Sequence, residues 1–280
     1  MKAPLWSLIA GIFGTLCASQ THAALIAYDG FSYTNGATIN GTNGGTGWTS
    51  AWTADASFVN YSSSTALTYS SGTVSVTGDN RTAIAGGAFS PLVDRTFAAQ
   101  TGTVYFSFLF RYEATAGGTI DADDFVHFML NNDNATANSG GIGKINSDAR
   151  LGSRIGGSNG GTTTNSATNM IAGNTYFLVG KISASGASGA NYDQMDLFIN
   201  PTSGTEPGTT SATDVADAGF SSLSHFTIRT NAVDANDAFL FDELRVGTTF
   251  ADVVPVIPEP SVGLLAIAGL GVAIARRRRN

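Results

Sequence analysis

The chain has 280 residues and a mass of 28.8 kDa, enough for one large domain or two small ones. Charged residues are only 12%, about half the usual share, which excludes a coiled coil and a charge-driven disordered chain. The formal net charge is −7, and residues 24–256 hold nine basic against twenty acidic residues, which argues against nucleic acid as a partner.

Residues 1–23 have the pattern of a secretory signal peptide. Lys2 supplies the positive start, an apolar stretch covers residues 5–18, and Thr21-His22-Ala23 is a small-residue cleavage site. The alternative is a short membrane anchor, although the apolar run is shorter than the ~20 residues of a span. Cys17, the only cysteine, lies in this segment, so the mature chain has no disulfide and no cysteine-ligated metal.

The middle of the chain has short apolar runs with a period of two, rich in β-branched and aromatic residues. Residues 103–112 show this most clearly, because phenylalanines 106, 108 and 110 alternate with a second set of side chains. Similar strands are predicted at residues 73–77, 125–130, 150–155, 176–182, 194–199, 226–229 and 239–246. Clusters rich in Gly, Ser, Thr and Asn predict loops at residues 40–47, 131–143, 156–168, 183–191 and 202–213.

Many short strands without helices between them predict an all-β fold. We expect one domain over residues 24–253, built as an antiparallel β-sandwich of the jelly-roll type around an aromatic core.

The C-terminus has three parts in a fixed order. A linker over residues 254–260 contains Pro258-Glu259-Pro260, residues 261–275 are apolar enough for a single transmembrane helix, and residues 276–280 begin with Arg276, Arg277, Arg278 and Arg279. The prolines keep the motif extended, and the arginines hold the far end in the cytoplasm.

This arrangement resembles the PEP-CTERM sorting signal. The resemblance implies recognition by an exosortase, after passage through the general secretion machinery and an inner-membrane intermediate. Delivery would be to the cell surface or exopolysaccharide matrix of a Gram-negative bacterium. A plain C-terminal membrane anchor is the alternative.

A second resemblance covers residues 25–253. Tyr28-Asp29-Gly30-Phe31, residues 102–106, residues 197–201 and residues 241–247 look like parts of a concanavalin A-like, laminin-G-like domain. In that fold the first and last strands lie side by side.

Glycosidases of this fold carry acids in a Glu-x-Asp-x-x-Glu pattern, about 5 Å apart for retaining hydrolysis. The pattern is absent here, and the candidate pairs Asp193 with Asp196 and Asp242 with Glu243 point to opposite faces of a strand. His127 and His225 lie among aromatic residues and are interpreted as packed side chains. We therefore expect no catalytic residues and no enzyme activity.

Calcium is the ion that the sequence favours, because it binds carboxylate oxygens between strands and loops. Asp121, Asp123 and Asp124 form one candidate cluster. Asp29 and Asp242 would form another if the terminal strands pair. The alternative is that these acids only keep the surface solvated.

Glycan binding needs exposed aromatic rings on which sugars stack. Trp48, Trp52 and Tyr61, near a loop rich in Gly and Thr, are the candidates, with core packing as the alternative. Residues 131–133 are a second suggestion.

Together these features predict an exported, surface-sorted protein that binds extracellular polysaccharide or acts in adhesion without catalysis. An extracellular glycan hydrolase or lyase is one alternative, and a purely structural surface protein is another.

Overall fold

The structure is a computed structural model. It describes residues 25–54, 58–61, 66–78, 81–85, 92–114, 120, 123–133, 138–145, 148–157, 163–234 and 237–257. The predicted signal peptide, Pro258-Glu259-Pro260, the apolar segment 261–275 and Arg276 to Arg279 lie outside these residues. No helix within the described ranges has the length and apolar composition that crossing a membrane requires.

The larger sheet has eight antiparallel strands in the order β14-β13-β12-β7-β16-β5-β2, with β1 also paired to β16. Its strands are β1 (Ala27–Asp29), β2 (Phe58–Tyr61), β5 (Arg81–Ala85), β7 (Val104–Ala114), β12 (Thr175–Ser183), β13 (Gln194–Ile199), β14 (Ala212–Val215) and β16 (Asp237–Gly247).

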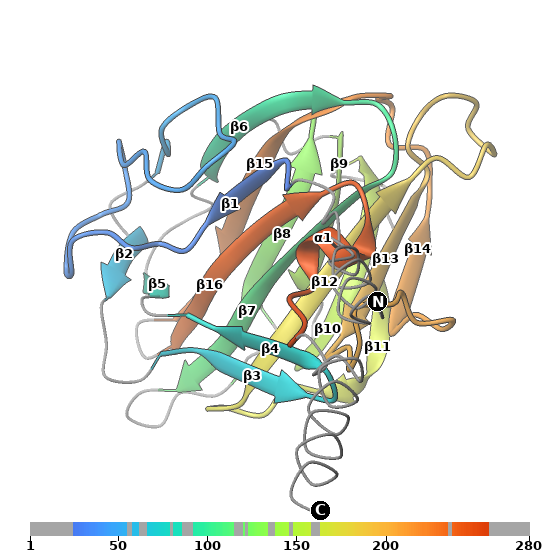
Figure 1. The fold of residues 1–280 in the computed structure, drawn as a ribbon. Helices are drawn as coiled ribbons and strands as arrows, with labels where there is room; N and C mark the ends of the chain where they lie inside the picture. The colour runs from blue at the N-terminus through green and yellow to red at the C-terminus, as the bar shows by residue number, and fades with distance from the viewer. Residues whose placement is uncertain are drawn as a thin grey trace, which may run out of the picture.

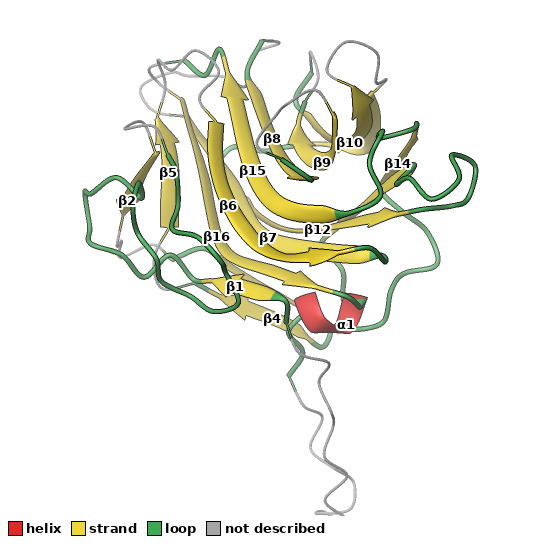
Figure 2. Cartoon of the chain, turned by 90° about the horizontal axis from the view of Figure 1, so that it is seen from above, coloured by secondary structure: helices red, strands yellow, loops and turns green. Residues whose placement is uncertain are grey.

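The second sheet has six antiparallel strands in the order β11-β10-β9-β8-β15-β6. These are β6 (Leu92–Gln100), β8 (Phe125–Asn131), β9 (Asn138–Lys144), β10 (Arg150–Gly157), β11 (Thr163–Asn169) and β15 (Leu223–Asn231). The long strands curve together, and the six-stranded sheet lies on the inner side of the curve (Figure 2). The prediction of an all-β antiparallel sandwich is confirmed.

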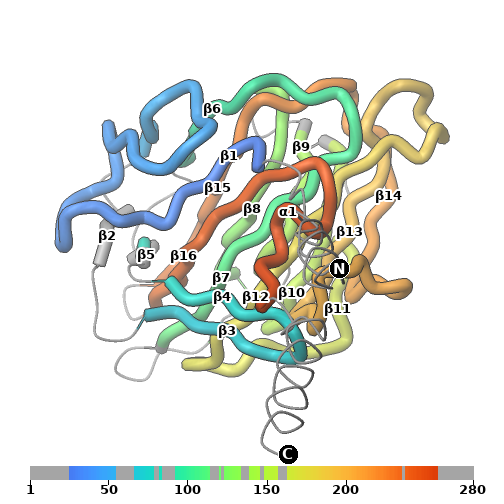
Figure 3. The backbone as a smooth tube through the Cα atoms, viewed as in Figure 1, coloured from blue at the N-terminus to red at the C-terminus, as the bar shows by residue number. Residues whose placement is uncertain are grey.

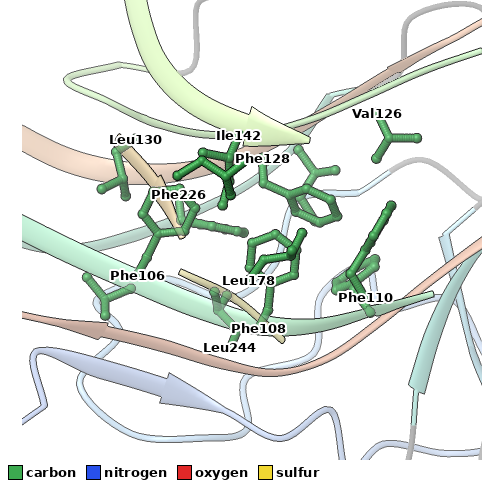
Figure 4. Packing of buried hydrophobic residues seen from close by; sticks show 14 of the residues in the cluster. Phe106, Phe108, Phe110, Val126, Phe128, Leu130, Ile142, Leu178, Phe226 and Leu244 are labelled. Atoms are coloured by element: carbon green, nitrogen blue, oxygen red, sulfur yellow. The ribbon is translucent and has the colours of Figure 1, made fainter. Parts of the chain in front are cut away.

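The core between the sheets is built from alternate residues of facing strands. On β7, Phe106, Phe108 and Phe110 point inward and are fully buried. The rings of Phe108 and Phe128, from opposite sheets, have centroids 4.2 Å apart, and Phe106 meets Phe226 edge-on (Figure 4). The period of two on β7 therefore places its aromatic face in the core, as predicted.

The outer face of the eight-stranded sheet carries a second apolar layer. The hairpin of β3 (Thr68–Ser71) and β4 (Val74–Thr77) and the short helix α1 (Phe250–Val253) lie across this sheet (Figure 1). Leu109 of β7 and Val76 of β4 belong to the buried cluster that they form with α1. This face is closed by the chain itself.

The first and last strands lie side by side, as the resemblance implied (Figure 3). β16 pairs with β5 through residues 238–241 and with β1 through residues 244–246. The change of partner occurs at a β-bulge, where Glu243 has a φ of 56°. One long strand, β16, thus pairs with two shorter strands on either side of the bulge.

The eight predicted strands all exist, but the predicted loops over residues 131–143 and 156–168 were partly wrong, because they contain β9 and β11. The sequence of β9 is rich in glycine and has no apolar alternation, so it does not have the usual pattern of a strand. A side chain at Gly141 would collide with the carbonyl oxygen of Phe128 on the neighbouring strand. Glycine is therefore a packing requirement here and not a loop signal.

We expect Gly141→Ala to lower the free energy of unfolding by about 1–3 kcal/mol, because the added methyl group meets backbone that cannot move cheaply. Gly102→Ala is the matched control, since nothing lies within 4 Å of the added methyl group, and it should change stability by less than about 0.5 kcal/mol. Urea unfolding of both variants measures the difference, and equal stabilities would contradict the close packing of β9 on β8.

Candidate functional site

The outer face of the six-stranded sheet is polar, in contrast to that of its partner sheet. Alternation sets this pattern, because Val126 and Phe128 of β8 and Phe226 and Ile228 of β15 point into the core and leave their neighbours on the other side. We call this surface the polar face. Its side chains are Asp94 on β6, His127, Met129 and Asn131 on β8, Arg154 on β10, and His225, Thr227 and Arg229 on β15.

Four of these side chains form one hydrogen-bonded set. His225 Nδ1 lies 3.0 Å from Asp94 Oδ1, and the Thr227 hydroxyl donates to the same carboxylate at 2.9 Å. Thr227 also lies 3.3 Å from Asn131 Oδ1. The side chains of Asp94 and His225 are 15% and 20% exposed, so the hydrogen-bonded set extends from buried positions in the sheet to the protein surface.

The Asp94 carboxylate fixes the orientation of the His225 ring. A carboxylate accepts at Nδ1, which leaves Nε2 of neutral His225 as the basic nitrogen. Such a pair can hydrogen-bond a hydroxyl group and can also accept a proton from it.

His127 is in a different environment on the same face. It is only 3% exposed, and its Nε2 has no hydrogen-bond partner. Burial and the nearby charges of Arg154 and Arg229 lower the pKa of His127 to about 3, against an opposing contribution from the Gly141 backbone. The His127 ring is therefore neutral at physiological pH.

A buried ion pair lies at the edge of this sheet. Asp29 of β1 and Arg95 of β6 contact each other, and both are 1% exposed. Trp52 Nε1 and the Tyr33 hydroxyl donate to Asp29 Oδ2 at 2.8 and 2.6 Å, and the Phe31 N–H donates to Oδ1. Both oxygens of this carboxylate are engaged by the protein.

The aromatic residues selected from the sequence belong to the same cluster. Trp52 is 1% exposed and stacks on Phe31. Trp48 is half-buried, donates from Nε1 to the Tyr28 carbonyl, and lies 4.9 Å below the Arg95 guanidinium. Tyr61 ends β2, and its side chain is outside the described residues. The Trp52 ring is thus enclosed by protein, and sugar stacking stays a prediction for Trp48 and Tyr61.

The structure does not bring Asp29 and Asp242 together, although their strands pair. Asp29 points between the sheets toward Arg95. Asp242 follows the inward-facing Phe241, so it points to the opposite side of the sheet, beside Gly78. The expected calcium cluster at these two residues therefore has its carboxylates on different faces.

Of the other predicted acidic cluster, Asp121 lies outside the described residues, Asp123 is exposed and Asp124 is buried. Within the described ranges, no group of three or more His, Cys, Asp or Glu side chains is arranged to hold a metal ion. Calcium at residues 121–124 stays a prediction.

The sequence did not identify Asp94, Arg154 and Arg229 as neighbours on the polar face. The sequence does contain a signal for their orientation, because each of these residues alternates with apolar residues of its own strand and so points to the opposite face. Which strands lie next to one another, however, depends on the sheet order, and the sequence predicts loops where β9 and β11 lie.

No protein-family model and no curated protein matches the chain. Solved structures resemble it at low identity. An endo-β-1,4-glucuronan lyase from the fungus Trichoderma reesei is 17% identical, with 80% of this chain and 98% of its own covered and a TM-score of 0.45. An endo-1,3-β-glucanase from Streptomyces sioyaensis is 12% identical, with coverages of 83% and 98% and a TM-score of 0.47. A carbohydrate-binding module from Bacillus subtilis is 11% identical, with coverages of 76% and 98% and a TM-score of 0.39.

These likenesses concern the arrangement of strands alone. The expectation that the chain is not an enzyme is nevertheless corrected, because a lyase and a glucanase are among the similar structures. The absence of a Glu-x-Asp-x-x-Glu pattern excludes catalysis by that arrangement of acids. It does not exclude catalysis by other side chains.

We expect Asp29→Asn to lower the free energy of unfolding by about 3–5 kcal/mol, because it leaves the Arg95 charge buried without its counter-charge. Asp148→Asn is the matched control. It breaks the surface pair with Arg150, whose side chains are 35% and 38% exposed, and should cost less than about 1 kcal/mol. Similar losses in chemical denaturation would show that burial does not strengthen the first pair.

We also expect stability to fall as the pH is lowered from about 6.5 toward 3. The pKa of His127 is about 3 in the folded chain and about 6.5 in the unfolded chain, so unfolding takes up a proton in this window. The slope attributable to His127 is at most about 1.4 kcal/mol per pH unit. His127→Gln should flatten the profile of unfolding free energy against pH, and an unchanged slope would contradict the neutral, buried ring.

Proposed function

We propose that the protein is exported and binds extracellular polysaccharide along the polar face. The observation that carries the proposal is the hydrogen-bonded set of Asp94, His225, Thr227 and Asn131. Sugar hydroxyl groups both donate and accept, and a carboxylate beside an imidazole offers partners of both kinds.

The architecture favours the polar face over the rest of the surface. The opposite outer face is occupied by the β3–β4 hairpin and α1. The polar face lies on the inner side of the curved sandwich, where an extended chain can contact several strands at once. The lyase, glucanase and carbohydrate-binding module of similar shape support a carbohydrate ligand.

Export is proposed from the two ends of the sequence. The signal-peptide pattern over residues 1–23 supports secretion. The Pro258-Glu259-Pro260 motif and Arg276 to Arg279 support sorting by an exosortase to the surface of a Gram-negative cell.

Cleavage of the bound polysaccharide is the second candidate function, and the Asp94–His225 pair favours it. A histidine held by a carboxylate at Nδ1 can take a proton at Nε2. A hydrolase would form new reducing ends with uptake of water. A lyase would form a new reducing end and a carbon–carbon double bond on the other fragment.

Affinity electrophoresis of the full chain, through gels cast with different polysaccharides, tests the proposal. We expect retardation in at least one gel. Asp94→Asn and His225→Gln should weaken binding roughly tenfold, since each removes a charge-assisted hydrogen bond. Glu113→Gln, which removes a negative charge from the outer side of the other sheet, should bind normally.

Incubation of the same polysaccharide with the full chain then separates binding from catalysis. New reducing ends that disappear in His225→Gln would establish cleavage, and ultraviolet absorbance of a double bond would identify a lyase. No retardation in any gel and no new ends would overturn the proposed function.

A further inference from the structure

The C-terminal end of the domain is a short strand on the layer that covers the eight-stranded sheet. Val256 forms an antiparallel bridge with Val74 of β4, and the Ile257 N–H donates to the Thr73 carbonyl at 2.8 Å. Val256 also packs against the buried cluster of this layer. Residues 255–257 therefore belong to the fold, and they end on the outer side of the β3–β4 hairpin.

The pairing with β4 stops at Ile257. The Thr73 N–H donates to the Thr202 carbonyl at 2.9 Å, so it is not available to Ile257. Pro258 and Pro260 have no N–H with which to continue a ladder. Ile257 is 55% exposed, so the chain reaches the surface at this residue.

The N-terminal end of the domain lies at the same layer. Leu25 packs against the same buried cluster as Val256. The connections to the predicted signal peptide and to the predicted span over residues 261–275 therefore leave from one side of the sandwich. We call this side, the outer surface of the β3–β4 hairpin and α1, the hairpin face.

The polar face lies on the opposite side of the sandwich (Figure 2). Packed sheets are about 10 Å apart, and the hairpin adds a second layer of similar thickness, so about 20 Å separate the two faces. Four peptide units join Ile257 to Ser261, where the predicted span begins. They reach at most about 14 Å. A tether of that length cannot bring the polar face flat onto a bilayer that holds the span.

The hairpin face also suits a position beside lipid headgroups because it is poor in charge. Residues 68–77 and 202–205 contain no charged side chain. Glu206, the next residue of that loop, accepts hydrogen bonds from Lys181 and from the Tyr105 hydroxyl. The chain as a whole has a net charge of −7, so a bilayer with anionic lipids repels its acidic surfaces more strongly than this one.

We propose that the hairpin face lies toward the membrane while the chain is anchored, and that the polar face points away from it. The partner of the hairpin face is then the lipid bilayer that holds residues 261–275. This inference rests on the proposed function and adds the orientation in which polysaccharide is bound. An anchored chain binds the polymer on its far side, where the membrane does not compete for the polar face.

The test places one fluorescent dye on either face of the anchored full chain. Cys17→Ser removes the only cysteine, and Ser70→Cys or Ala98→Cys then supplies a single labelling site. Ser70 is exposed on β3 of the hairpin face. Ala98 is exposed on β6 and lies on the polar face, since it is an even number of residues from Asp94.

The labelled chains are reconstituted into vesicles of phosphatidylcholine and phosphatidylglycerol that carry a nitroxide quencher on some headgroups. We expect the dye on Ser70→Cys to lose most of its fluorescence, because it lies beside the headgroups, and the dye on Ala98→Cys to keep it. Vesicles without nitroxide give the reference fluorescence of each dye. Circular dichroism of both labelled chains confirms that they are folded.

A longer linker tests whether the reach of the tether sets the orientation. An insertion of about twelve Gly and Ser residues after Pro260 adds about 20 Å of average reach and leaves the domain unchanged. The difference in quenching between the two dyes should then shrink. An unchanged difference would overturn the argument from the length of the tether.

Equal quenching of the two dyes, or stronger quenching at Ala98→Cys, would overturn the proposed orientation. Failure of the chain to float with the vesicles would also overturn it, since no span would then hold the domain. Polysaccharide binding is measured on the same vesicles, by co-flotation of the polymer that retards the chain in gels. Oriented chains that bind no polymer would overturn the proposed function and leave the orientation standing, so the two failures are distinguishable.

Discussion

The buried ion pair of Asp29 and Arg95 joins the first strand of one sheet to the edge strand of the other. Removing two charges from water is costly, and here further donors to the carboxylate and carbonyl acceptors for the guanidinium offset the cost. The pair holds the loop over residues 30–54 against β6, where Trp48 bridges to Phe97 and Thr53 to Asp94. These bridges cover an edge that would otherwise expose unpaired backbone groups. They also fix Asp94, on which the polar face depends.

The outer face of one sheet is apolar and covered, and the outer face of the other sheet is polar. The eight-stranded sheet places Leu109 and Leu240 outward and covers them with the β3–β4 hairpin and α1. The six-stranded sheet places histidines, arginines and an aspartate outward, and its polar groups bond to one another across three strands. One face therefore completes the hydrophobic core, and the other leaves hydrogen-bonding side chains at its surface.

Strand positions could be predicted from the sequence wherever apolar residues alternate, as in residues 103–112, because burial of one face imposes that pattern. Strands β9 and β11 could not, since Gly141 and the Thr and Asn residues of β11 carry no apolar alternation. Neighbouring strands and the ion pair between residues 29 and 95 depend on the order of strands in space, which one-dimensional patterns do not contain. For that reason the sequence did not show that His225 pairs with Asp94, whereas His127 is buried beside Phe125, in agreement with its interpretation as a packed side chain. Tryptophan is commonly buried, and Trp52 follows the alternative interpretation of core packing.

The position of β16 at the centre of the eight-stranded sheet governs when the domain can fold. β1, β5 and β7 all use β16 as a partner, and contacts such as that between Tyr28 and Glu243 join residues 215 positions apart. During synthesis from the N-terminus, β1 has no partner until almost the whole domain has been made. Contacts so distant along the chain close slowly. The eight-stranded sheet can therefore be completed only after residues 237–247 have been synthesised, whereas neighbouring strands such as β8 and β9 can pair as soon as both have been made.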